Sequence, residues 1–172
     1  MLTTAVKDAH WLINATFEDV TDELANRKPP GDANPLGTAY AHLALSEDAV
    51  VNGLLRGQPP LFAESFQGRT GVDRTMPMPG FEEGDLGDWF RNATVEVEPA
   101  RAYAAEVFSS TERFIEEVDD ETLGREIDLS GLGLGTKLFS DVVTMFIVGH
   151  CQNLSGEISA VKGMFGLKGY PF

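Results

Sequence analysis

A long apolar stripe near the C-terminus limits the possible folds of this chain more than any other feature. Between Leu138 and Phe165, apolar residues recur at the spacing of one helix face, at Phe139, Val143, Phe146, Ile147, Leu154, Ile158 and Val161. This pattern predicts a long helix that buries one face. His150 falls within the stripe, so its imidazole should lie in the core. There it needs a polar partner, a metal ion or a local hydrogen bond.

Three further segments have helical spacing of their apolar residues, at residues 3–20, 35–56 and 98–118. The pattern also indicates a short helix over 21–26 and one or two helical turns over 85–91. In the second long helix we expect Asn34 to cap the N-terminus and Pro35 to occupy the first turn. The residues expected to face inward there are Tyr40, Leu43, Val50 and Leu54.

The links between these segments indicate the architecture. Residues 57 to about 86 are rich in proline and glycine and exceed the 2 to about 8 residues of a bundle turn, so they predict a crossover between helices 2 and 3. Residues 125–137 form a glycine-rich link, in which we expect tight turns. No strand signal is present beyond a brief alternation at 94–98. The prediction is an all-α four-helix bundle, with the first two helices as antiparallel neighbours, in one domain over residues 1–172.

Composition excludes several classes of partner. The chain has 13 Lys plus Arg against 27 Asp plus Glu, a formal charge of −14, and no basic stripe. Such a charge repels phosphate backbones and anionic lipid heads, so we expect neither nucleic-acid nor membrane partners. No apolar run reaches the roughly 20 residues of a membrane span. The expected partners are small molecules or other proteins. A homodimer is expected by analogy alone, because helical bundles commonly pair through a helical face.

The N-terminal segment and the single cysteine suggest where the protein works. The opening residues lack the basic and apolar regions of a secretory signal, so a cytoplasmic location is expected. Cys151 is the only cysteine, which excludes an internal disulfide and a cysteine-based zinc cluster. We interpret Cys151 as a small buried apolar residue, with a reactive thiol as the alternative.

Three histidines lie on or near the inward faces of three different helices. His10 is in line with the apolar residues of the first helix, His42 borders the apolar face of the second, and His150 is in the middle of the fourth. Facing helices of a bundle are a common place for metal sites, so these residues are candidate ligands. The alternative is a neutral imidazole hydrogen-bonded to a carbonyl, a hydroxyl or another histidine.

Two stretches of sequence carry a family resemblance. The pattern AHLALSEDAVVNGLLRG after a proline-containing loop, and VGHCQNLSGEISAVKGMFGLKG near the C-terminus, resemble the DinB-like (DinB/YfiT) superfamily of four-helix bundles. The resemblance covers nearly the full length, including the long crossover. The histidine of helix 2 in that family, followed five residues later by a glutamate, corresponds to His42 and Glu47.

The pattern of the fourth helix in that family is met only in part. His150, Gly156, Glu157 and Ile158 match it, whereas Leu154 occupies the position of a second histidine. The resemblance implies a divalent ion, typically nickel or zinc, held by three histidines. Family members include thiol-dependent transferases and isomerases. This chain therefore retains two of the three implied ligands, His42 and His150.

A replacement for the third ligand would have to come from His10, Glu47 or Glu157. Glu157 lies two turns from His150, roughly 10 Å along the axis, which is far for a shared ion. Glu47 projects about 140° around the helix from His42 and should approach from another side. A carboxylate in a helix usually reaches solvent, although Glu47 lies within an apolar stripe. The depth of His10 along the bundle decides whether it can act as the third ligand.

Two functions follow as hypotheses. The first is a metal-dependent enzyme of the thiol S-transferase type, in which the ion binds a low-molecular-weight thiol as its thiolate. The second is a metal-free small-molecule-binding or interaction protein, in which Leu154 contributes to an apolar pocket. A metal-free proton transfer by His150, with Glu47 orienting it, is a further possibility. The aromatic residues that could line a ligand pocket, or else belong to the core, are Trp11, Tyr40, Trp89 and Phe90.

Overall fold

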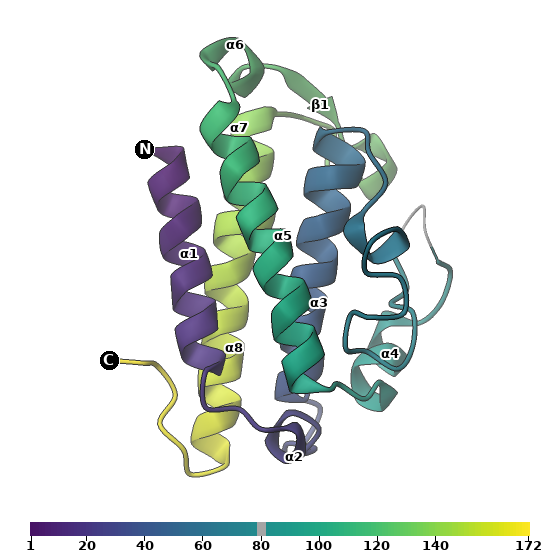
Figure 1. The fold of residues 1–172 in the computed structure, drawn as a ribbon, viewed down its shortest axis with the longest axis vertical. Coiled ribbons are helices and arrows are strands. Elements are labelled where there is room, and N and C mark those ends of the chain that lie inside the picture. The colour runs from purple at the N-terminus through teal and green to yellow at the C-terminus, as the bar shows by residue number, and fades with distance from the viewer. Residues whose placement is uncertain (79–81) are drawn as a thin grey trace.

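Four long helical segments form a bundle in the computed structural model, which describes residues 1–78 and 82–172 (Figure 1). The segments are α1 (Leu2–Phe17), α3 (Leu36–Asp48) continued by the π-helix η1 (Ala49–Leu55), α5 (Val97–Glu117), and α7 (Phe139–Val143) continued by the π-helix η4 (Thr144–Gly149) and α8 (His150–Met164). The predicted all-α four-helix bundle is confirmed. No helix among the described residues is long and apolar enough to cross a membrane.

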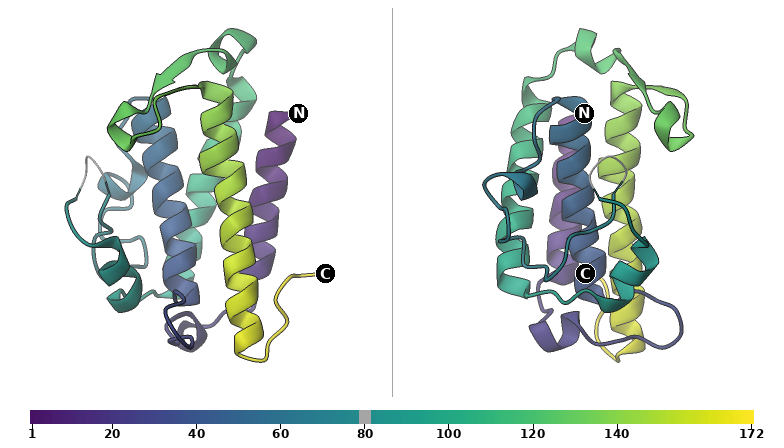
Figure 2. Two further views of the ribbon diagram at one scale, coloured as in Figure 1. Left: turned by 180° about the vertical axis from the view of Figure 1, so that it is seen from behind. Right: turned by 90° about the vertical axis from the view of Figure 1, so that its right-hand side faces the viewer.

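The order of the helices around the bundle differs from the prediction. The closest backbone packing is between α1 and α8, α3 and α8, α3 and α5, and α1 and α5. Helices α1 and α3 therefore lie on a diagonal, and not as the direct neighbours that the short link suggested. They run antiparallel (Figures 1 and 2). Their side chains meet in the core, where the rings of Phe17 and Tyr40 stack with centroids 4.1 Å apart.

The long crossover is a consequence of this arrangement. Helices α3 and α5 pack side by side and run in the same direction, so the chain must return along the length of the bundle between them (Figures 1 and 2). The crossover contains the 3-10 turn η2 (Leu61–Ala63) and α4 (Leu86–Asn92). Its residues 79–81 lie outside the described residues.

One buried carboxylate fixes the start of the crossover. Asp48, at the end of α3, is fully buried and accepts hydrogen bonds from the backbone N–H groups of Leu61 and Phe62, both at 3.0 Å. It also accepts from the Asn52 side chain at 2.6 Å and the Tyr103 hydroxyl at 2.7 Å. The carboxylate thus has donors from η1, η2 and α5, as a buried polar group requires.

The predicted short helix over 21–26 is present, and side-chain caps begin this helix and a second short one. Thr21 caps α2 (Asp22–Ala25), and Asp119 caps α6 (Asp120–Leu123), because each side chain accepts from a backbone N–H three residues later. The predicted Asn34 cap of α3 is wrong. Pro35 precedes the first helical residue, and the Asn34 amide donates to Glu157 at 2.9 Å instead.

The glycine-rich link contains a small antiparallel hairpin that the sequence did not indicate. Strands β1 (Glu126–Asp128) and β2 (Thr136–Leu138) pair across the 3-10 turn η3 (Ser130–Leu132). Gly133 and Gly135 follow that turn with φ angles of 73° and 64°, which favour glycine. The hairpin lies at the end of the bundle where α7 begins (Figure 1).

Candidate functional site

A large apolar pocket opens beside the second and fourth helical segments. Its volume is about 740 Å³. The α3/η1 and η4/α8 segments form two walls, and the crossover and the hairpin loop contribute the others. The lining residues are His42, Ser46, Ala49, Val50, Gly53, Leu54, Pro77, Met78, Leu86, Leu132, Met145, Phe146, His150 and Asn153. A pocket of this size accommodates a drug-sized or metabolite-sized molecule.

Both π-helices contribute to this pocket. In a π-helix the backbone bonds run from residue i to i+5, so side chains beyond it are rotated relative to those of a continuous α-helix. Val50 and Leu54 in η1, predicted to face the core, instead line the pocket, and Leu54 is 38% exposed. Phe146 in η4 does the same on the opposite wall.

His42 lies in the pocket wall with one ring nitrogen occupied. Its Nδ1 is 3.2 Å from Met76 Sδ and 3.4 Å from Ser46 Oγ. The ring also meets Phe90 edge to face at 5.0 Å. Burial, and to a lesser degree the nearby His150, lower the pKa of His42 to about 4. The imidazole is therefore neutral at physiological pH.

His150 faces His42 across the same wall. The two ring centroids are 5.0 Å apart at an interplanar angle of 81°. Burial lowers the pKa of His150, and the charge of Glu47 acts in the opposite direction. Among the described residues, three ring nitrogens have no hydrogen-bond partner: both nitrogens of His150 and Nε2 of His42. Every described side-chain nitrogen that is buried from solvent does have a partner. The three nitrogens are therefore not buried, and they are accessible from the pocket.

The spacing of the two rings allows a shared ion, but the set of donors is incomplete. An imidazole nitrogen about 2.0–2.1 Å from zinc places the ring centroid about 3.2 Å from it, so two such centroids lie about 5.2 Å apart at a tetrahedral angle. Among the described residues, however, no third histidine, cysteine or carboxylate groups with His42 and His150. Three protein ligands are usual for catalytic zinc, and two imidazoles do not satisfy that requirement.

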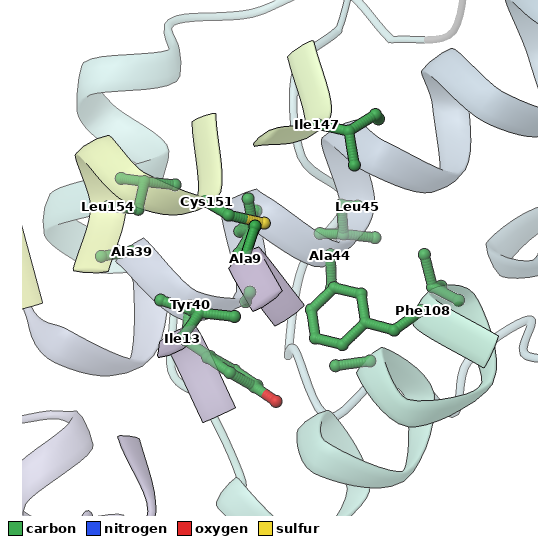
Figure 3. Close-up of a cluster of buried hydrophobic side chains, with 14 of the residues drawn as sticks. Ala9, Ile13, Ala39, Tyr40, Ala44, Leu45, Phe108, Ile147, Cys151 and Leu154 are labelled. Carbon is green, nitrogen blue, oxygen red and sulfur yellow. The ribbon is translucent and has the colours of Figure 1, made fainter. Parts of the chain in front are cut away.

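Leu154, in place of the third histidine, belongs to the core. It is 6% exposed and packs with Ala39, Tyr40 and Cys151 in a cluster of buried side chains (Figure 3). It does not line the pocket. The neighbouring Asn153 does, one turn from His150.

His10 lies away from this wall, in the centre of the bundle. It is 2% exposed and is not among the lining residues of the pocket. Its Nδ1 lies 2.8 Å from Glu112, and its Nε2 lies 3.0 and 3.2 Å from the two carboxylate oxygens of Glu47. The diagonal placement of α1 and α3 explains this, because it directs His10 toward Glu47 instead of His42.

His10 lies between two carboxylates, which favour its protonated form. An ionised carboxylate only accepts hydrogen bonds, so an imidazole with a proton on each ring nitrogen matches both partners. Burial opposes this charge, but Glu47 and Glu112 outweigh burial and raise the pKa of His10 above its usual value. The ring stacks on Phe108 with centroids 4.3 Å apart.

Glu47 does not reach solvent, contrary to the usual behaviour of a helical glutamate. Its side chain is fully buried, and His10 is its hydrogen-bond donor. Its charge acts on Cys151 and on the pocket residue His150. Glu47 thus interacts with two histidines: it hydrogen-bonds to the buried His10, and its charge acts on His150 in the pocket wall.

Cys151 is buried, as predicted. Burial and the charge of Glu47 raise the pKa of its thiol well above the usual range, so the thiol is protonated. His10, Glu47 and Cys151 form a group in which one potential ligand atom of each lies within 4.8 Å of the others.

Sequence reasoning found two of the pocket residues and missed most of the rest. His42 and His150 were identified by their place in apolar stripes. The polar lining residues Ser46 and Asn153 carry no sequence signal beyond lying one turn from a histidine. Trp11, Tyr40, Trp89 and Phe90 do not line the pocket; Trp11 is 58% exposed, and Tyr40 and Trp89 are in the core.

Comparisons with known proteins agree with the fold. No curated protein matches the sequence significantly. A solved structure described as a conserved protein of a locus from Enterococcus faecalis is similar, with a TM-score of 0.74 and 17% identity over 94% of this chain and 95% of that one. At that identity the likeness shows the fold alone. The sequence model of the DinB superfamily matches residues 7–154. The chain therefore belongs to the DinB superfamily.

Proposed function

We propose that this protein binds a small, largely apolar molecule in the 740 Å³ pocket and directs a polar group of that molecule toward His42 and His150. The observation that carries the proposal is the pocket itself, an apolar space in which two neutral imidazoles are the main polar groups. Pockets of this kind, apolar with a few convergent polar groups, are the usual form of small-molecule sites.

The imidazoles indicate what the polar group of the ligand is. A neutral imidazole offers one donor and one acceptor, so a hydroxyl, amide or thiol suits it. An anionic group is disfavoured, because the protein carries a formal charge of −14 and Glu47 acts on His150 from behind the wall. The expected ligand is a neutral molecule with an apolar body.

A matched pair of substitutions tests this proposal with a neutral apolar dye, Nile red, as the probe. Met145 lines the pocket, whereas Met164 lies in α8, is 56% exposed and does not line it. Met145→Trp should weaken dye binding by about tenfold or more, equivalent to at least about 1.4 kcal/mol. Met164→Trp should leave dye binding unchanged. Equal effects of the two substitutions, or no saturable binding by the wild type, would overturn the proposal.

A second candidate is a metal-dependent enzyme of the thiol S-transferase type. The observation in its favour is the 5.0 Å separation of the His42 and His150 rings, whose free nitrogens are accessible from the pocket. The incomplete set of donors counts against it. The deciding measurement is metal content of untagged protein. Stoichiometric nickel or zinc that is lost in His42→Ala would favour the enzyme. Binding that appears only in Leu154→His would favour the ligand-binding protein.

The homodimer and the cytoplasmic location stay predictions. Size-exclusion chromatography with light scattering measures the first, and cell fractionation the second.

A further inference from the structure

A second group of chemically active side chains lies in the centre of the bundle, apart from the pocket. His10 comes from α1, Glu47 from α3 and Cys151 from α8, and they are 2%, 0% and 0% exposed. We propose that these three residues form a binding site for a divalent transition-metal ion, with His10 Nε2, a carboxylate oxygen of Glu47 and Cys151 Sγ as its ligands.

The distances within the group are close to those of a metal site. Ligand atoms around a tetrahedral zinc ion lie about 3.3–3.7 Å apart. His10 Nε2 and Glu47 Oε1 are 3.0 Å apart, and one ligand atom from each of the three residues lies within 4.8 Å of the others. The widest gap must therefore close by no more than about 1.5 Å, which rotation of the side chains can supply. Three ligands leave a fourth position open.

His10 is already oriented as a metal ligand. Histidines that bind metal usually donate their second N–H to a carboxylate, which fixes the ring and makes the ligating nitrogen more basic. Glu112 accepts from His10 Nδ1 at 2.8 Å, leaving Nε2 to face Glu47. Phe108 stacks on the imidazole at an interplanar angle of 14° and holds its plane. Both supporting residues come from α5.

Charge balance permits the exchange of protons for an ion. Without metal, the hydrogen bond between His10 Nε2 and Glu47 contains one proton, and the Cys151 thiol contains another. A divalent ion displaces one proton from His10 Nε2 and one from Cys151 Sγ. Two positive charges replace two, so the summed charge of the buried group does not change. The ion therefore enters without adding net charge to the core, which would be costly.

The donor set indicates which ions bind. One imidazole, one thiolate and one carboxylate suit zinc and the similar ion cobalt(II), and do not suit magnesium or calcium, which prefer oxygen ligands. This site also differs from one between His42 and His150, because only the central site contains a thiolate.

Cobalt(II) is the probe that separates the two places. Cobalt bound by a thiolate absorbs in the near ultraviolet through charge transfer from sulfur, whereas cobalt bound by imidazoles alone does not. The full-length protein should bind one cobalt ion with this band, and zinc should displace it. Cobalt is supplied both to folded protein and during refolding, because the site is buried and access could otherwise limit binding.

Three variants complete the test. Cys151→Ser and Cys151→Ala should both abolish the band, and circular dichroism of each shows that the helices remain folded. Glu47→Gln should weaken cobalt binding by at least about tenfold, or about 1.4 kcal/mol. His42→Ala, outside the group, should leave the band unchanged. Absence of stoichiometric cobalt, a spectrum without the thiolate band, or loss of the band in His42→Ala would each overturn the proposal.

Discussion

Glu47 and Asp48 are consecutive buried carboxylates on α3, yet their surroundings are opposite. Asp48 accepts from four donors that belong to α3/η1, η2 and α5. Glu47 accepts from a single residue, His10, among the described residues, and a thiol and the back of the pocket lie beside it. A buried charge with all its acceptor positions filled holds elements together, whereas one with positions to spare is available for chemistry.

The largest expected effect is on the side of Asp48. Asp48→Ala leaves the Tyr103 hydroxyl and two backbone N–H groups without their acceptor, so the free energy of unfolding should fall by on the order of 4 kcal/mol. Urea denaturation measures it. Asp48→Asn, which keeps some acceptor capacity, should lose less. A loss below about 1 kcal/mol in Asp48→Ala would break the comparison.

The second expected effect concerns Glu47 and depends on pH. Because the folded-state pKa of His10 lies above its usual value of 6.5, its ion pair stabilises the fold fully below that pH and loses this effect as the pH rises through the folded pKa. Glu47→Gln should therefore cost about 3 kcal/mol near pH 6 and progressively less at higher pH.

Denaturation of the wild type and Glu47→Gln across pH 6 to about 9 gives that difference. Glu112→Gln is the control, since this more exposed carboxylate should act with the same sign but less strongly. A cost that grows with pH would contradict the ion pair.

The third expected effect extends the comparison to a histidine without a carboxylate partner. The pKa of His42 is about 4, below the 6.5 of an ordinary histidine, so the unfolded chain binds a proton there that the folded protein does not. Stability should thus decrease by about 2–3 kcal/mol as the pH falls from 6.5 to 4, a sign opposite to that of His10. His42→Gln should reduce this slope, and an unchanged slope would show that His42 is not responsible.

The smallest expected effect removes one donor from Asp48. Tyr103→Phe keeps the ring in the core and deletes the hydroxyl that donates at 2.7 Å, so the free energy of unfolding should fall by about 1.5 kcal/mol. The Tyr103 ring also packs against Phe66, and Tyr103→Phe keeps that contact, so the change in stability measures the loss of the hydroxyl. No measurable change in thermal denaturation would indicate that the other three donors satisfy Asp48 alone.

The sequence predicted the helices well because each one has enough turns to show its period. The stripe from Phe139 to Val161 extends over about six turns, and a proline or glycine cluster marks most of the ends. The hairpin was missed because its strands have three residues each, too few for an alternation to be recognised. The diagonal order of α1 and α3 was missed because the length of a link limits which helices can be neighbours without deciding it.

The candidate site could be predicted only in part, for a related reason. His42 and His150 stand out as polar residues in apolar stripes. The pairing of His10 with Glu47 depends on how two helices cross, which periodicity within one helix does not contain. The π-helices at 49–55 and 144–149 leave no clear pattern in the sequence, so the places of Val50 and Leu54 were predicted for a regular α-helix.

The two π-helices have a consequence for how this pocket can be modified. A π turn is equivalent to one extra residue that an α-helix accommodates without breaking. Deleting a single residue from 49–55 would restore regular α-helical bonding there and rotate the side chains that follow. The volume of the pocket is therefore set by chain length as well as by side-chain size, and one-residue deletions are a route to reshaping it that substitutions do not provide.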